Sequence, residues 1–351
     1  MRYRLLGKSG LRVSELCLGA MTFGEDWGSM LPGASKEEAK KIFNLFVSKG
    51  GNFIDTANVY QNGTSEKYVG EFISSEREKF VLATKYTLTT NPDDPNASGN
   101  HRKNLVQSVD ASLRRLKTHY IDLLWVHVWD PMTPVEEVIR SLDDLIRSGK
   151  ILYIGISDAP AWVVSHANAI AELRGWSSFI GIQIMYNLIE RSAERELLPM
   201  ARTLDIGTTA WSPLGGGVLS GKYIKQDSKD QKRFNVNDPM SASFVNERTI
   251  SIATEVQTIA NEMNKTPSQI ALNWIRQQHD RGVIIPIIGA RTEAQIKDNL
   301  GCLDFELTSD QLKSLDEKSK IQLGFPHDFI SEAAKIFLYG NTYTLIDNHR
   351  A

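Results

Sequence analysis

The sequence predicts an α/β protein in which strands and helices alternate and close into one (β/α)₈ barrel over residues 1–351. Two observations support this fold. The strand candidates are apolar along most of their length, as expected of parallel strands that helices cover on the outside. The longer stretches between them carry apolar residues at helical spacing, and no low-complexity linker divides the chain. An N-terminal β-hairpin and extra helices and loops at the C-terminal face complete the expected architecture.

The strand candidates follow one another at regular intervals along the chain. A short hairpin comes first, at Arg2–Leu6, with its turn at Lys8–Gly10. Each later candidate is a short apolar run rich in β-branched residues. These runs are Ser14–Leu18, Asn52–Asp55, Phe80–Lys85, Ile121–His127, Ile151–Ser157, Phe179–Tyr186, Gly207–Trp211 and Val283–Gly289.

The intervening segments carry helix signals. One apolar face consists of Val135, Val138, Ile139, Leu142, Leu145 and Ile146. Thr133-Pro134 is expected to open that helix, and Gly149 to close it. Capping boxes are expected at Ser35, Thr266 and Thr308, each followed three residues later by Glu or Gln. The polar stretches Thr90–Asn100 and Gln226–Asp238 are read as loops.

This order of elements allows either a closed barrel or a doubly wound sheet. A doubly wound dinucleotide-binding sheet carries Gly-x-Gly-x-x-Gly between its first strand and the following helix. The glycine run that starts at Gly215 comes late in the chain, and Ser220 stands where the motif needs its last glycine. The closed barrel is therefore favoured.

The composition of the chain limits the kinds of binding partner and the cellular compartment that we expect. The chain has 40 basic and 42 acidic residues and a net charge of -2, so no nucleic-acid partner is expected. Its two cysteines, Cys17 and Cys302, are read as buried free thiols, which suits a reducing compartment. No signal peptide and no apolar run near the ~20 residues of a membrane span is evident. We expect a cytoplasmic protein without a membrane partner.

Ionisable residues end three consecutive strands. Asp55, Lys85 and His127 close the second, third and fourth strand candidates, and Tyr60 follows Asp55 in the next loop. Taken alone, each residue could have a purely structural role. Asp55 could be a turn carboxylate and Lys85 a lysine that reaches solvent. His127 could be a hydrogen-bonded core histidine and Tyr60 a surface tyrosine. Barrel chemistry lies at the C-terminal ends of the strands, where adjacent ends meet. Their joint position therefore favours a single site.

These four residue types suit proton transfer to a carbonyl oxygen. A tyrosine hydroxyl has a pKa near ~10, which a neighbouring lysine ammonium lowers. A carboxylate keeps the lysine charged, and a histidine can hydrogen-bond the substrate oxygen. The set has no metal cluster and no nucleophile beside a base. Carbonyl reduction by a bound hydride donor fits it best.

These residues resemble, in identity, order and spacing, the catalytic tetrad of the aldo-keto reductases. The strings GNFIDTANVYQNGTSE, ATKY and DLLWVHVWD around them agree, and the resemblance runs from about Tyr3 to near Lys318. It implies a (β/α)₈ TIM barrel that reduces aldehydes or ketones as small-molecule substrates, with Tyr60 as proton donor and NADPH (NADP⁺) as cofactor.

The resemblance also implies a cofactor site along the strand ends. Met21 and Thr22 would lie beside the nicotinamide ribose near Asp55, and Ser157, Asp158 and Gln183 would hold the nicotinamide amide. Trp211 would stack on the ring. The pyrophosphate would lie under Ser212, Leu214 and Gly216, and the adenosine phosphate beside Gly289, Arg291, Gln295 and Asn299.

The residues around Arg291 support this assignment independently. Arg291 lies at a strand-to-helix turn, and Thr292 with Gln295 is expected to cap the helix that follows. A guanidinium beside a helix N-terminus suits a phosphate and favours NADPH over NADH. The alternative is a plain helix cap with a surface arginine.

Two positions depart from the family pattern. Asp158 stands where many members have asparagine, so its carboxylate can accept a hydrogen bond from the nicotinamide amide but not donate one. Trp211 replaces a commoner tyrosine and keeps an aromatic stacking face.

The substrate pocket is less defined by the sequence. Phe23, Trp27 and Trp129 are read as its aromatic wall, or as residues that pack loops onto the barrel. The aromatic tail after Gln322 either caps the pocket or packs elsewhere. Two other functions compete with reduction: a non-catalytic NADPH-binding subunit resembling those of potassium channels, and an unrelated barrel enzyme such as a phosphosugar isomerase. Substrate identity, preferred direction and oligomeric state are not predicted.

Overall fold

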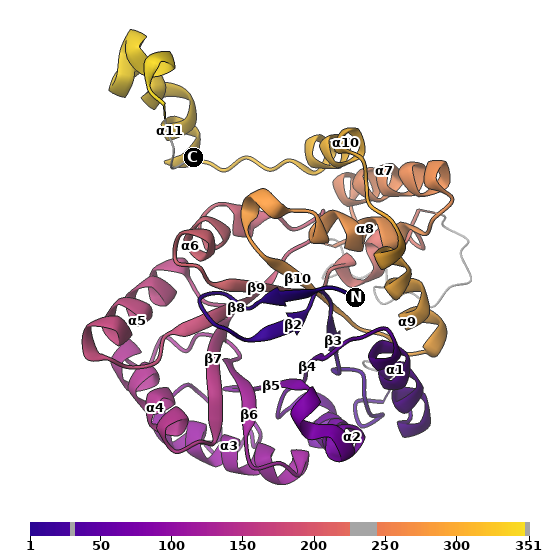
Figure 1. Ribbon diagram of the computed structural model, residues 1–351, viewed down its shortest axis with the longest axis vertical. Coiled ribbons are helices and arrows are strands. Elements are labelled where there is room, and N and C mark those ends of the chain that lie inside the picture. The colour runs from indigo at the N-terminus through magenta and orange to yellow at the C-terminus, as the bar shows by residue number, and fades with distance from the viewer. Residues whose placement is uncertain (29–31, 225–243, 348–351) are drawn as a thin grey trace.

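The computed structural model describes residues 1–28, 32–224 and 244–347. Eight parallel strands form a closed barrel in the order β10-β3-β4-β5-β6-β7-β8-β9, and helices surround it (Figure 1). The predicted fold is confirmed. The loop expected at Gln226–Asp238 lies outside the described residues.

The strands are short and lie close to their expected places. The hairpin strands are β1 (Tyr3–Leu5) and β2 (Arg12–Ser14). The barrel strands are β3 (Cys17–Gly19), β4 (Phe53–Asp55), β5 (Val81–Tyr86), β6 (Ile121–Val126), β7 (Ile151–Ser157), β8 (Phe179–Met185), β9 (Gly207–Trp211) and β10 (Ile284–Ile288).

The α-helices follow the strands and continue beyond the barrel. They are α1 (Lys36–Ser48), α2 (Thr64–Ile73), α3 (Arg102–Leu116), α4 (Val135–Arg147), α5 (Ala161–Arg174), α6 (Leu197–Thr203), α7 (Glu247–Met263), α8 (Pro267–Arg276), α9 (Glu293–Leu300), α10 (Ser309–Ser319) and α11 (His327–Ala334). None of these described helices is long and apolar enough to cross a membrane.

The first predicted strand, Ser14–Leu18, is wrong as a single element. Ser14 ends β2, which pairs antiparallel with β1, and the barrel begins only at Cys17. The Ser14 hydroxyl explains the break, because it donates to the Leu16 carbonyl at 2.7 Å and accepts the backbone N–H groups of Asn52 and Phe53, each at 3.2 Å. A side chain thus replaces ladder hydrogen bonds where the chain leaves the hairpin.

The expected helix caps are largely confirmed. Thr266 and Thr308 form full capping boxes, and the Ser35 hydroxyl accepts the Glu38 N–H. The cap expected at Thr133 is wrong, because its hydroxyl donates to the Asp130 carboxylate at 2.6 Å and α4 starts without a side-chain cap. The Thr133 hydroxyl is therefore bonded to Asp130 and does not cap α4.

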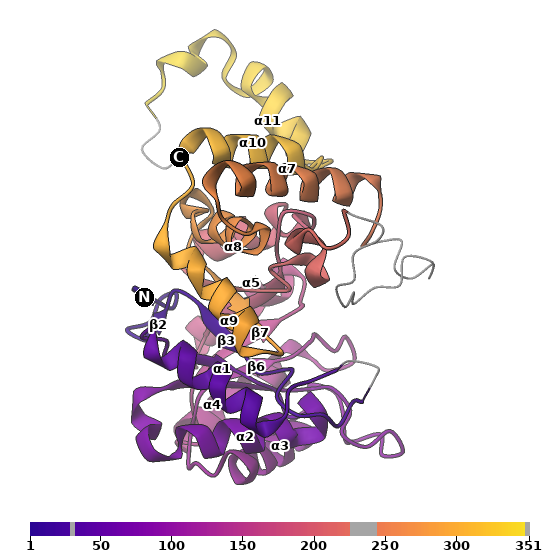
Figure 2. The same cartoon turned by 90° about the vertical axis from the view of Figure 1, so that its right-hand side faces the viewer.

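The interior of the barrel has its own apolar core. Leu6 and Val13 of the hairpin pack with Cys17 and with barrel side chains such as Phe53 and Trp125, so the hairpin closes the N-terminal end. Figure 2 shows the hairpin at the end of the barrel opposite the loops that follow the strands. Both cysteines are buried and free, as predicted.

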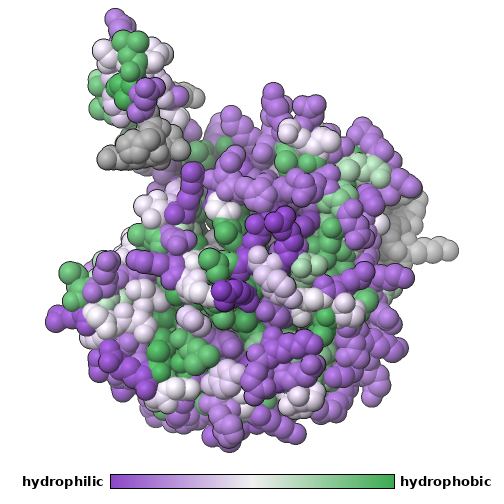
Figure 3. All heavy atoms as spheres, in the orientation of Figure 1, coloured by the Kyte–Doolittle hydropathy of each residue, from purple (hydrophilic) through white to green (hydrophobic). Residues whose placement is uncertain are grey.

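The C-terminal tail lies outside the ring of helices, beyond α10 (Figure 1). The Arg195 guanidinium holds its start, donating to the backbone carbonyls of Gln322 and Leu323 at 2.9 and 3.1 Å. Apolar side chains such as Phe325 and Phe337 remain exposed on it (Figure 3). The described tail therefore does not cover the strand ends.

Trp125 determines which residues the neighbouring strands can carry. A Cβ atom on Gly155 would lie 2.2 Å from the Trp125 ring and 2.9 Å from the backbone oxygen of Gly181. We expect Gly155→Ala to lower the free energy of unfolding by about 1–3 kcal/mol, since overpacking forces side chains and backbone apart. Urea unfolding measures this change.

Gly10→Ala is the control for that substitution. Nothing lies within 4 Å of a Cβ at Gly10, so its unfolding free energy should stay within about 0.5 kcal/mol of the parent. Equal stabilities for the two variants would contradict a barrel interior packed against Trp125.

Candidate active site

The four predicted catalytic residues meet at the C-terminal ends of β4, β5 and β6. Asp55 ends β4, Lys85 is the residue before the end of β5, and His127 directly follows β6. The register places Asp55 beside Ala83 and Lys85 beside Trp125 on the neighbouring strands. Tyr60 begins a short 3₁₀ turn, Tyr60–Gly63, above the same rim.

Lys85 and Asp55 form a buried ion pair. The exposed fractions of their side chains are 0% and 4%, and the Lys85 ammonium contacts the Asp55 carboxylate directly. The ammonium also donates to the Thr56 carbonyl at 2.9 Å, and the Gln183 amide donates to the other Asp55 oxygen at 3.0 Å. Burial lowers the pKa of Lys85, but Asp55 and Tyr60 raise it more, so the pKa ends above its usual value and the lysine is charged.

Tyr60 lies against this ion pair. The Lys85 ammonium is 4.8 Å from the centroid of the Tyr60 ring. Burial raises the pKa of the Tyr60 hydroxyl, and the charge and hydrogen bond of Lys85 lower it by less. The expected net lowering of this pKa is therefore wrong for the structure, because desolvation exceeds the effect of the lysine. Tyr60 is protonated at neutral pH.

His127 lies against the same tyrosine. Its ring meets the Tyr60 ring edge-on, with centroids 5.7 Å apart and an interplanar angle of 82°. Burial, and then the charge of Lys85, lowers the pKa of His127 to about 3. Its Nδ1 atom is buried and has no hydrogen-bond partner among the described residues. The imidazole is therefore neutral and has unused hydrogen-bonding capacity.

A residue that the sequence analysis missed, Gln61, holds the loop of Tyr60. Gln61 is fully buried, and its backbone φ of 48° lies in the left-handed region. Its side chain accepts the Trp27 N–H at 3.0 Å and donates to the Met21 carbonyl at 3.4 Å. The loop after β3 is thus tied to the tyrosine loop. A glutamine directly after Tyr60 is the only sequence signal.

The three aromatic residues predicted to form a pocket wall lie in different surroundings. Phe23 is 0% exposed and packs edge-on against Phe72 in the core, so its assignment to a pocket wall is wrong. The sequence could not show this, since both readings need an aromatic residue. Trp27 lies edge-on to Tyr60, with ring centroids 6.3 Å apart. Trp129 is partly buried and packs against the core.

The ends of β7, β8 and β9 bring the predicted nicotinamide residues together. Ser157 pairs with Gln183 in the strand register, and Gln183 already binds Asp55. The Asp158 carboxylate accepts the indole N–H of Trp211 at 3.0 Å. Burial raises the pKa of Asp158, while hydrogen bonds from Trp211 and Ser157 lower it by less, so the net shift is upward. Asp158 thus orients the indole.

The loop after β9 contains residues with left-handed backbone conformations. Ser212 and Gly216 have φ angles of 53° and 63°, and the Ser212 hydroxyl accepts the Gly216 N–H at 3.1 Å. Asn187, a second missed residue, is buried and donates to the Ser212 carbonyl at 2.9 Å. In the sequence, the signal for Asn187 is a polar residue shortly after the apolar strand β8. Leu214 is half-buried against the core.

The predicted adenosine-phosphate residues surround the start of α9. The Thr292 hydroxyl caps this helix, and the Gln295 side chain accepts the Arg291 N–H at 2.8 Å. Asn299 donates to the Gly289 carbonyl at 3.2 Å. Across the same turn, the Thr22 hydroxyl donates to the Ala290 carbonyl at 2.7 Å. These contacts join the ends of β3 and β10.

The Arg291 guanidinium is available to a ligand. It is half-buried and makes no hydrogen bond or ion pair with the rest of the described chain. A guanidinium without a protein partner fits an anionic group such as a phosphate. In the loop after β9, the N–H groups of Gly215, Gly216 and Gly217 already bind within the loop. In the described ranges, no group of three or more His, Cys, Asp or Glu side chains is placed to hold a metal ion.

Comparison with known proteins agrees with this geometry. The chain is 36% identical to a norsolorinic acid reductase of Aspergillus flavus over 338 residues, which cover 94% of this chain and 84% of the relative. It is 38% identical to norsolorinic acid reductase B of Dothistroma septosporum (94% and 85% covered) and 36% identical to an aryl-alcohol dehydrogenase of Pestalotiopsis microspora (94% and 85% covered).

The family model for the aldo/keto reductase family matches residues 15–320, which contain the whole barrel from β3 to β10. This chain belongs to the aldo/keto reductase family.

Proposed function

We propose that this protein reduces aldehydes or ketones to alcohols with NADPH and that Tyr60 donates the proton. The observation that carries the proposal is the buried Asp55–Lys85 pair, which lies against a protonated Tyr60 beside a neutral His127. Bound NADPH would supply the hydride that the protein's own side chains lack.

Each of the four side chains has a separate role in the proposed reaction. Tyr60 holds the proton that goes to the carbonyl oxygen. The Lys85 ammonium stabilises the phenolate left behind, and the Asp55 carboxylate keeps that ammonium charged in its buried position. Neutral His127 can donate a hydrogen bond to the carbonyl oxygen and orient it toward Tyr60.

The cofactor would extend from the indole of Trp211 to the start of α9. Gln183 and Ser157 would bind the nicotinamide amide, with Asp158 positioning Trp211 through the hydrogen bond of 3.0 Å. The Ser212–Gly216 loop would cover the pyrophosphate. Arg291 would pair with the 2′-phosphate, which distinguishes NADPH from NADH.

Aromatic carbonyl compounds are the proposed substrate class. Trp27 lies edge-on to Tyr60 and so places a flat apolar surface beside the proton donor. Relatives that are 36% identical bear the names norsolorinic acid reductase and aryl-alcohol dehydrogenase.

Tyr60→Phe should reduce kcat by at least ~100-fold and leave the Kd for NADPH nearly unchanged, because only the proton donor is removed. The measurement is the loss of NADPH absorbance with aryl and size-matched aliphatic aldehydes and ketones. Tyr153→Phe, on β7, is the control. Normal turnover in Tyr60→Phe would rule out this acid, and NADPH binding without turnover in the parent would favour a regulatory subunit.

His127→Gln should remove part of the acid sensitivity of folding. The folded protein keeps His127 neutral down to about pH 3, whereas an unfolded histidine binds a proton below ~6.5. The unfolded state therefore binds more protons, and His127 lowers the unfolding free energy by at most ~1.4 kcal/mol per pH unit as the pH falls below 6.5. Urea unfolding between pH 7 and 4 should show a shallower loss in His127→Gln than in the parent or in exposed His119→Gln. Equal slopes would contradict a neutral His127.

Arg291→Ala should weaken NADPH binding at least ~10-fold and leave NADH binding almost unchanged, because a charge-assisted contact to one phosphate is lost. Fluorescence titration with each cofactor measures both Kd values. Lys297→Ala, which removes a cation from the same helix α9, is the control. Equal losses for NADPH and NADH would place Arg291 away from the 2′-phosphate.

A further inference from the structure

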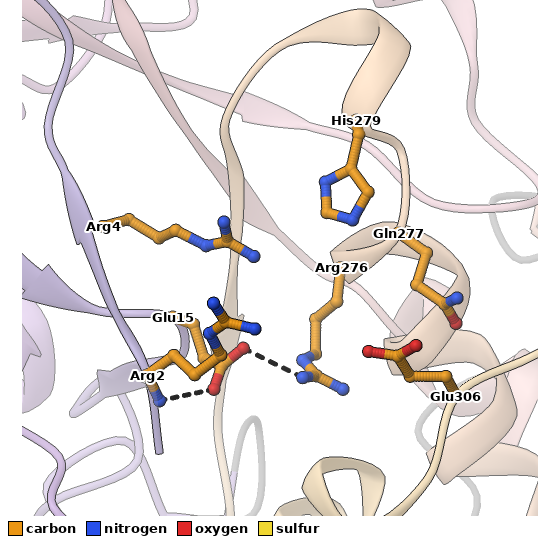
Figure 4. A pocket seen from close by; sticks show the side chains of 7 residues that line it. All are labelled: Arg2, Arg4, Glu15, Arg276, Gln277, His279 and Glu306. Carbon is orange, nitrogen blue, oxygen red and sulfur yellow. Dashed lines mark hydrogen bonds and ion pairs between the residues drawn. The ribbon is translucent and has the colours of Figure 1, made fainter.

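A cavity lies at the opposite end of the barrel from Tyr60. Its volume is about 310 Å³, and Arg2, Arg4, Glu15, Arg276, His279 and Glu306 line it (Figure 4). Glu15 comes just before β3, and His279 comes just before β10. The cavity therefore opens at the N-terminal ends of the strands, beside the hairpin, and the reduction chemistry proposed above does not use it.

Two arginines from the hairpin point into this cavity. Arg2 and Arg4 are two residues apart around β1, so their side chains leave the extended chain on the same side. Figure 4 shows both guanidinium groups turned toward that of Arg276, which comes from the end of α8. Neither the Arg2 nor the Arg4 guanidinium forms a hydrogen bond or ion pair with another described residue.

Arg276 is held rigidly by the protein. Its Nη1 atom donates to the Asn273 side chain at 2.7 Å and to the Cys302 carbonyl at 2.6 Å. Its Nη2 atom donates to Glu15 at 2.9 Å. A guanidinium has two N–H groups on each Nη atom, so one N–H of Nη2 is unused by these contacts. The arginine is thus oriented before any ligand binds.

The charges in the cavity do not balance. Burial raises the pKa of Glu15, but hydrogen bonds from Arg2 N–H and Arg276, and the charge of Arg276, lower it further, so Glu15 is ionised. It offsets Arg276 and also attracts Arg4, and the other carboxylate in the lining is that of the exposed Glu306. The two carboxylates repel an extended polyanion. Three guanidinium groups against two carboxylates leave these five side chains with a net charge of +1, which attracts a small oxyanion.

We propose that this cavity binds a small hydroxylated phosphate monoester. Guanidinium groups bind phosphoryl oxygens in a bidentate manner, and Arg2, Arg4 and the remaining Nη2 donor of Arg276 supply such contacts from two sides. The Glu306 carboxylate accepts a hydrogen bond from a ligand hydroxyl. The volume is at the small end of the ~300–1,000 Å³ of ligand pockets, which suits a small molecule. Hydrophilic side chains gather on this face of the molecule (Figure 3).

Calorimetric titration of the full chain at low ionic strength tests the proposal with three probes. Glycerol 3-phosphate should bind saturably and more tightly than inorganic phosphate, and glycerol should not bind. Arg4→Ala and Arg2→Ala should each raise the Kd for glycerol 3-phosphate roughly tenfold, because each loses a charge-assisted contact. Arg12→Ala, on the same hairpin but outside the cavity, should leave it unchanged.

Three outcomes would overturn the proposal. The first is the absence of saturable binding of glycerol 3-phosphate. The second is a Kd that rises in Arg291→Ala but not in Arg4→Ala, which would place the phosphate in the cofactor site instead. The third is equal affinity for inorganic phosphate and glycerol 3-phosphate, which would remove the role of Glu306. Arg2→Ala and Arg4→Ala change the hairpin outside the barrel wall, and a thermal melt equal to that of Arg12→Ala confirms that each variant folds.

Discussion

The buried ion pair between Lys85 and Asp55 is the interaction on which the rest of the site depends. A lysine with no exposed side chain stays charged only if a carboxylate and further acceptors surround it. Asp55, the Thr56 carbonyl and the tyrosine above supply that environment, and removing one partner of such a pair costs about 3–5 kcal/mol. The stability of the fold and the proposed proton donation therefore depend on the same two adjacent strand ends.

The pair also links Tyr60 to the rest of the rim. Gln183, on β8, donates a hydrogen bond to the second carboxylate oxygen of Asp55. In the order of strands around the barrel, β8 lies opposite β4. Tyr60 lies on the lysine, and His127 lies on the tyrosine, so each ring is oriented by the next group. The contacts thus run from the Asp55 carboxylate to the Lys85 ammonium and from the ammonium to the tyrosine that it lies against.

The two ends of the barrel have different architectures. At the C-terminal end, long loops carry the polar groups, and two buried amides, Gln61 and Asn187, fix their shape. At the N-terminal end, the hairpin inserts Leu6 and Val13 into the barrel, and Arg2 and Arg4 point into the cavity beside it. The hairpin thus completes the interior core and at the same time forms one wall of the basic cavity.

The sequence by itself determined the barrel and the identity of the four residues at its rim. It could do so because regularly spaced apolar strands are compatible with few topologies, and because Asp55, Lys85 and His127 each lie at or next to the C-terminal end of such a strand. The tertiary structure decided the protonation states of the site residues and the positions of individual aromatic side chains. Desolvation raised the pKa of Tyr60 above its ordinary value, and packing placed Phe23 in the core. Both depend on distances between segments far apart in the chain, as does the break at Ser14, where a hydroxyl meets the N–H groups of β4. Local pattern carries no information on those distances.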